Sequence, residues 1–181
     1  MRPLRVLYLQ PATDFGGAER QATYLMAGLP RHGIEVVPLV GPGRRLVDEL
    51  AAVGVRATHH PDFPRDELKP RSPLGRAALV GEWVRAFFHM SREVDRFLVR
   101  EPCDVIFASR PFAWVVGGRV ATWRRLPVVW RAGTLFSHAA QPGWLRVCER
   151  LWPAHSVVCT SEAVRRALAE HVAAPMLVVH N

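Results

Sequence analysis

Two adjacent glycines near the start of the chain have the placement expected of a phosphate-binding turn. Gly16 and Gly17, followed by Ala18-Glu19, lie between the apolar residues 6–9 and an amphipathic stretch. Glycines at such a junction let the backbone turn and bring N–H groups near a ligand, and the next helix begins with a partial positive charge. A site for phosphate or a phosphate-bearing sugar nucleotide is therefore predicted, with an ordinary strand–helix turn as the alternative.

Polar residues also follow three later apolar stretches: Arg110 follows the fourth expected strand, Arg131 ends the fifth, and Ser161 comes after the sixth. Ligands of parallel α/β sheets bind beyond the carboxyl ends of the strands, so these residues are candidates for a binding site. Arg131 suits bidentate binding of a phosphate, with a surface ion pair as the alternative. Helix capping explains Ser161 equally well.

Short apolar runs that alternate with helical patterns must position these residues. The expected strands are Leu4–Leu9, Glu35–Val40, Ala57–His60, Val105–Ser109, Val128–Arg131, Val157–Thr160 and Leu177–His180. Amphipathic spacing predicts helices after Glu19 and before Gly54, and further helices at 112–123, 144–151 and 162–171. This alternation predicts an α/β fold: one Rossmann-like, doubly wound, mainly parallel sheet of about seven strands with helices on both faces. Residues 61–75, which are rich in proline, are expected to form an irregular loop.

Composition narrows the function classes. The net charge is +8, Lys69 is the single lysine among 24 basic residues, and no nucleic-acid-binding module is recognisable. The three cysteines are scattered, which favours buried thiols in a reducing compartment over a disulfide or metal site. We find no signal peptide pattern and no apolar run of the roughly 18 residues needed to span a bilayer, so a cytoplasmic location is expected.

Residues 76–100 combine arginines with Trp83, Phe87, Phe88 and Phe97. A basic amphipathic helix of this kind can lie on an anionic membrane, which would make the protein peripheral on the inner face. The alternative is a long helix packed on the sheet with its arginines in solvent.

The order of these segments resembles the N-terminal domain of family 4 glycosyltransferases of the GT-B fold. The resemblance rests on the strand before Gly16-Gly17-Ala18-Glu19, on HSVVCTSEAVRRAL at residues 155–168 and on MLVVHN at residues 176–181. It implies that residues 1–181 form the acceptor-side Rossmann-like domain. A C-terminal donor-binding domain would then be absent from this chain and come from a longer protein or a partner chain.

The resemblance also implies an activity, namely transfer of a sugar from a nucleotide-sugar donor to a glycan or lipid-linked acceptor, with retention and without a metal or other cofactor. Gly16 and Gly17 would lie near the donor diphosphate, and the acceptor would contact Glu19, Arg110, Thr134 and Ser161. For Glu19, the helix dipole is an equal explanation. Alanine occupies position 132, where many members carry histidine, so the catalytic candidates are Arg131 and His138; a solvated loop histidine is the alternative for His138.

The resemblance covers half of a typical enzyme, so the chain alone is expected to be inactive. The Glu-x7-Glu spacings at 93/101 and 162/170 fall in expected helices and not after a glycine-rich loop, so they are interpreted as chance matches. The alternative function is a non-enzymatic α/β module that binds a nucleotide or phosphorylated ligand. Against that alternative, the glycines do not form the G-x-G-x-x-G pattern of dinucleotide-binding domains.

Overall fold

The computed structural model describes residues 2–11, 15–41, 43–59, 73–133 and 141–180. Within them, a seven-stranded sheet has the order β3-β2-β1-β4-β5-β6-β7, and every neighbouring pair is parallel. The strands are β1 Leu4–Gln10, β2 Ile34–Val40, β3 Thr58–His59, β4 Val105–Ser109, β5 Val128–Ala132, β6 Ser156–Cys159 and β7 Met176–Val178. The predicted doubly wound α/β fold is confirmed.

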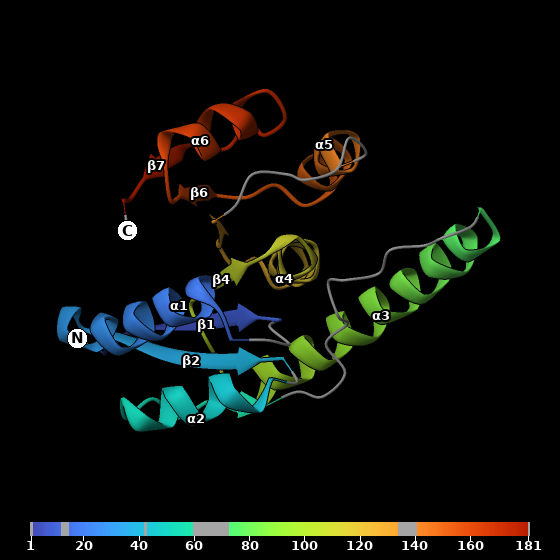
Figure 1. Cartoon of the computed structure of the whole chain (residues 1–181). Helices are drawn as coiled ribbons and strands as arrows, with labels where there is room; N and C mark the ends of the chain where they lie inside the picture. Colours follow the sequence, from blue (N-terminus) through green and yellow to red (C-terminus); the bar gives the residue numbers. More distant parts are fainter. Residues whose placement is uncertain (1, 12–14, 42, 60–72, 134–140, 181) are drawn as a thin grey trace.

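Helices connect these strands and cover the sheet (Figure 1). They are α1 Gly17–Gly28, η1 Leu29–His32, α2 Arg44–Ala52, α3 Pro73–Arg100, α4 Pro111–Arg124, α5 Gln141–Leu151 and α6 Glu162–Ala169. The longest is α3, and its N-terminal part projects away from the sheet in Figure 1.

Alternate side chains of β1 point to opposite faces of the sheet and contribute to two separate apolar clusters. Leu7 and Leu9 join the larger apolar cluster, which includes residues of α3 and α4, whereas Tyr8 joins the cluster formed with α1 and α2. Successive side chains of a strand point to opposite faces, so a strand buried on both sides is apolar at every position. Residues 6–9 of β1 meet this requirement.

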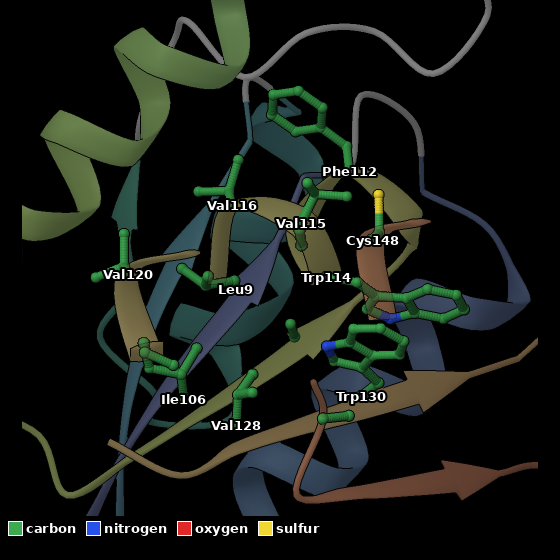
Figure 2. Packing of buried hydrophobic residues seen from close by; sticks show 14 of the residues in the cluster. Leu9, Ile106, Phe112, Trp114, Val115, Val116, Val120, Val128, Trp130 and Cys148 are labelled. Atoms are coloured by element: carbon green, nitrogen blue, oxygen red, sulfur yellow. The ribbon is translucent and has the colours of Figure 1, made fainter. Parts of the chain in front are cut away.

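Helix α4 lies against the centre of the sheet and is buried along nearly its whole length, as expected for a helix that is apolar on all sides. An added Cβ at Gly117 would lie 3.1 Å from a side-chain atom of Ile106 and 3.2 Å from one of Leu9, so the missing side chain lets the helix approach the sheet. Figure 2 shows this packing, including the rings of Trp114 and Trp130, which stack with centroids 5.3 Å apart.

The observed boundaries differ from the expected ones by one or two residues at the edge strands. The last strand is β7 at Met176–Val178, and the third expected strand is reduced to the pair Thr58–His59. Helix α3 begins at Pro73, which corrects the expectation of an irregular loop up to residue 75; residues 61–72 of that loop lie outside the described residues. Proline at the start of a helix is favoured because its missing N–H would have no intrahelical partner there.

Candidate functional site

The strand order reverses between β1 and β4, and such a switch point is where ligands bind in doubly wound sheets. Gln10 is the last residue of β1, Arg110 directly follows β4, and Arg131 lies near the end of β5. The N-terminus of α1 follows β1 at the same edge. The fold therefore brings together three of the predicted segments, at residues 16–19, 110 and 131.

The glycine pair is the start of α1. Gly16 is the N-cap in extended conformation, and Gly17 is the first helical residue; neither has a positive φ. Neither glycine therefore uses the conformational freedom that distinguishes glycine, because other residues adopt these conformations. An added Cβ at Gly17 would meet no heavy atom within 4 Å among the described residues, so neither backbone nor packing explains this glycine.

Glu19 is a buried carboxylate at the centre of the site. It accepts hydrogen bonds from the backbone N–H of Gly16 at 2.9 Å, from Gln10 Nε2 at 3.2 Å and from Arg110 Nη2 at 2.5 Å. Its side chain is 3% exposed, compared with 34% for Arg110. Burial alone would raise the pKa of Glu19, but the bonds from Arg110 and Gly16 outweigh it and hold the pKa below its ordinary value. Glu19 is therefore ionised at neutral pH.

Arg110 has an unusual backbone, with φ 81° and ψ 150°. This region favours glycine, and a residue with a side chain is held there at a cost of about 1–3 kcal/mol. The ion pair with Glu19 fixes its side chain, while the following Pro111 favours the observed ψ. Strained residues of this kind concentrate at functional sites, which supports Arg110 as a site residue.

Arg131 differs from Arg110 in its partner. It is 6% exposed, and Nη2 donates to the neutral amide oxygen Oε1 of Gln21 at 2.9 Å. Among the described residues, no carboxylate forms an ion pair with it, which contradicts the alternative of a surface ion pair. A buried cation without an anionic partner is unusual and is typical of an anion-binding site.

Tyr8 lies beneath this edge, wholly buried, on the α1 side of the sheet. Burial raises its pKa to about 12, although the positive charge of Arg131 acts in the opposite direction. The phenol therefore stays neutral under Arg131 and does not offset its charge.

The other predicted site residues give less evidence for a role in binding. Ser161 is the N-cap of α6 and accepts a hydrogen bond from the N–H of Val164 at 3.2 Å, so capping accounts for it. Nearby, Thr160 Oγ1 donates to the carbonyl oxygen of Gly133 at 3.3 Å. Thr134 and His138 lie outside the described residues.

Gln10 and Gln21 belong to the candidate site through their contacts with Glu19 and Arg131, and the sequence analysis missed both. Neither belongs to a motif or carries charge, so only the geometry identifies them. For Gln10 one signal was available, since a polar residue ends an otherwise apolar strand.

The structure bears on both the cysteine prediction and the metal prediction. Cys103, Cys148 and Cys159 are buried free thiols, as predicted, and burial raises the pKa of each. Within the described ranges, no group of three or more His, Cys, Asp and Glu side chains is arranged to hold a metal. The absence of a metal requirement stays a prediction.

An open groove of about 690 Å³ lies at the opposite edge of the sheet, beside the starts of β1 and β2. Arg5 lines it but pairs with Glu35 and Glu101, each at 2.9 Å. Its charge is thereby neutralised, so this groove is a weaker candidate for an anion than the edge at Arg131.

A surface cluster of aromatic residues lies where α3 meets α4. The guanidinium of Arg119 is 5.0 Å from the ring centre of Phe88, 5.6 Å from that of Phe87 and 5.8 Å from that of Trp123. Phe88 is 48% exposed and Trp123 70%, and Val80 and Val84 of α3 are exposed as well. We call Val80, Val84, Phe88, Arg119 and Trp123 the α3/α4 patch.

The same helix α3 also contributes to the core, since Phe87, Met90, Val94 and Leu98 are buried. This part of α3 is therefore packed on the body of the protein, and membrane contact through its exposed residues stays a prediction. None of the described helices is both long and apolar enough to cross a membrane.

The fold and this edge define a Rossmann-like α/β domain of the kind that forms one half of a GT-B protein. The chain belongs to Glycosyltransferase Family 4, whose sequence model matches residues 15–181. Comparison with curated proteins finds no significant match.

Similar solved structures share this fold. A glycosyltransferase from Rickettsia africae has a TM-score of 0.68 at 16% identity, over 100% of this chain and 44% of that one. HepE of Anabaena, solved in complex with UDP and glucose, has a TM-score of 0.65 at 19% identity, over 98% of this chain and 44% of HepE. This chain therefore spans less than half the length of either protein.

The fold alone does not define the reaction. A putative UDP-N-acetylglucosamine 2-epimerase from Listeria monocytogenes has a TM-score of 0.66 at 9% identity, over 94% of this chain and 42% of that one. The family match is what distinguishes the chain as glycosyltransferase-like.

Proposed function

We propose that the chain is the acceptor-binding half of a retaining glycosyltransferase, of the hexosyltransferase class, that transfers a sugar from a nucleotide-sugar donor to a glycan or lipid-linked acceptor. One observation carries the proposal beyond family membership: the buried guanidinium of Arg131 has a neutral partner and lies at the same edge of the sheet as the N-terminus of α1. The two features together supply positive potential where a diphosphate would leave.

The charges at this edge favour a ligand anion near Arg131. Glu19 and Arg110 neutralise each other within their ion pair, so the charge of Arg131 is not compensated by them. The N–H of Gly16 already donates to Glu19, and the N–H of Gly17, in the first turn of α1, adds a donor suited to a phosphate oxygen. These groups would stabilise the negative charge that develops on the leaving diphosphate, which is an electrostatic contribution to catalysis.

For the acceptor, the proposal assigns different roles to the two partners of the ion pair. Arg110 is partly exposed and would contact the acceptor, whereas Glu19 is buried and would act by holding Arg110. Thr134 and Ser161 stay candidates for further contacts. No described residue at this edge is placed as a general base, and we propose that the leaving phosphate takes the proton of the acceptor hydroxyl.

The donor would be held mainly by a second domain. The chain spans 44% of the length of HepE, the neighbour whose structure contains UDP and glucose. We propose that a C-terminal domain or a partner chain supplies most of the nucleotide-sugar site, and that residues 1–181 alone transfer no sugar. Family membership favours this over the alternative of a non-enzymatic nucleotide-binding module.

We further propose that the α3/α4 patch contacts an anionic membrane at the cytoplasmic face, which would suit a lipid-linked acceptor. Exposed aromatic rings at the level of lipid headgroups, together with an arginine, are typical of interfacial binding. Arg119 pairs with rings and not with a carboxylate among the described residues, so its charge stays available to an anionic surface.

Titration of the chain with inorganic pyrophosphate, followed by amide NMR, tests the anion site. We expect the largest shifts at the N–H groups of Gly16 and Gly17 and at residues around Arg131. Shifts concentrated in the groove beside Arg5, or no shifts at millimolar pyrophosphate, would contradict the proposal.

A further inference from the structure

Two arginines at the same edge of the sheet are held in different ways by residues of one helix. Glu19 of α1 holds Arg110 with a carboxylate, and two residues later Gln21 holds Arg131 with an amide oxygen. Glutamate and glutamine have the same shape, so the two contacts differ mainly in charge. The first neutralises its arginine, and the second only orients it.

We infer that Gln21 is a positioning residue that fixes the guanidinium of Arg131 while leaving its charge available to the diphosphate of the substrate. The inference rests on the proposed function, since it assumes that Arg131 binds an anion. A carboxylate at position 21 would form an internal ion pair with Arg131 and compete with the ligand.

The position of Gln21 on α1 supports this role. It lies four residues after Gly17, and residues four apart lie on the same side of a helix. The bond of 2.9 Å from Arg131 therefore connects β5 to the side of α1 on which Gly17 lies. One hydrogen bond thus fixes the guanidinium relative to the free N–H groups at the start of α1. A ligand that bridges both would meet a preorganised pair of sites.

The burial of Arg131 makes its charge sensitive to this partner. The residue is 6% exposed, so water screens its charge weakly. Placing an additional negative charge at hydrogen-bond distance would change the local potential more than the same change on the surface. The uncharged amide at position 21 therefore favours anion binding by Arg131, whereas a carboxylate there would weaken it.

Pyrophosphate binding by the 181-residue chain, measured by isothermal titration calorimetry alongside thermal unfolding without ligand, tests the inference. We expect Gln21→Glu to weaken binding about tenfold or more, because the new carboxylate offsets the charge of Arg131. The unfolding midpoint should stay the same or rise, because an ion pair replaces a neutral contact. A purely structural residue would lower binding and stability together.

Arg20→Gln is the matched control, since it changes the net charge by the same amount at the neighbouring, exposed position. It should weaken binding much less than Gln21→Glu. Equal binding by Gln21→Glu and the wild type, or an equal effect of Arg20→Gln, would overturn the role of Gln21 but not that of Arg131. A fall in the unfolding midpoint that parallels the loss of binding would overturn it too.

Arg131→Gln separates this inference from the proposed function. Loss of pyrophosphate binding in that variant supports Arg131 as the anion-binding residue whatever Gln21→Glu does. If the wild type does not bind pyrophosphate, or if Arg131→Gln binds as well as the wild type, the anion site itself is contradicted and the role of Gln21 falls with it.

Discussion

At the scale of single residues, the ion pair of Glu19 and Arg110 connects β1, α1 and the end of β4 around one buried carboxylate. Arg110 keeps a backbone conformation that glycine would adopt more readily. The pair therefore ties these elements together and fixes the side chain of a strained arginine at the edge where we propose that the ligand binds.

Replacing Glu19 by glutamine should make stability less sensitive to acid. The pKa of Glu19 is lowered in the folded chain, so its contribution is present above the ordinary value of 4.5 and is lost as the pH falls through the folded-state pKa. Near pH 7 we expect Glu19→Gln to destabilise the chain by about 1–3 kcal/mol. In urea unfolding from pH 7 to pH 3, the two stability curves should converge; a constant gap would contradict the assignment.

Gly17 is the residue at which a substitution should affect protein stability and pyrophosphate binding most differently. Its helical backbone and the open space around it mean that Gly17→Ala should leave stability unchanged or raise it by up to about 1 kcal/mol. Pyrophosphate binding should nevertheless weaken, because the methyl group occupies space near the free N–H groups. Gly28→Ala, at the other end of α1 and also in open space, is the control and should leave binding intact.

At the scale of elements, the sequence predicted the sheet well because the central strands are largely buried on both faces. Apolar runs such as Val105–Ser109 match the observed strand, and only the edge strands β3 and β7 were longer in prediction than in the structure. Burial forces apolar residues at every position of a central strand, whereas an edge strand can be short.

The site was predictable only in part, for a physical reason. Its segments follow from the rule that ligands bind at the carboxyl ends of strands, which located residues 16–19, 110 and 131. The pairing of Glu19 with Arg110, 91 residues apart, and of Gln21 with Arg131, 110 apart, depends on strand order and on side-chain direction. Local sequence patterns contain neither.

The close packing of α4 gives a prediction at this scale. An added Cβ at Gly118 would lie 3.0 Å from the Cβ and 3.2 Å from the backbone oxygen of Trp152, so backbone must move to accept it. Gly118→Ala should cost about 1–3 kcal/mol in urea unfolding. Gly81→Ala, in open space on α3, should be neutral or stabilising; an equal loss in both variants would contradict the packing argument.

At the scale of the whole molecule, the two proposed surfaces would have different partners. The carboxyl edge of the sheet would meet a diphosphate and an acceptor, whereas the α3/α4 patch would meet lipid. A domain with these two surfaces would hold a lipid-linked acceptor at the membrane while a second domain delivers the donor.

The lipid prediction is testable by sedimentation with anionic phospholipid vesicles. The double variant with Phe88→Ser and Trp123→Ser should reduce the fraction of protein bound to vesicles several-fold, because both exposed rings are lost. Tyr24→Ser removes a ring that is 67% exposed on α1, outside the α3/α4 patch, and should have little effect. Equal binding to uncharged vesicles would contradict the role of Arg119.

The most direct test of the central claim is the affinity of the chain for pyrophosphate with and without the charge of Arg131. We predict that the wild type binds it and that Arg131→Gln weakens binding at least about tenfold, which corresponds to about 1.4 kcal/mol. Arg92→Gln, which removes the same charge from an exposed position of α3, should retain binding within about twofold at constant salt. Equal affinities of the wild type and Arg131→Gln would contradict an anion site at this edge of the sheet.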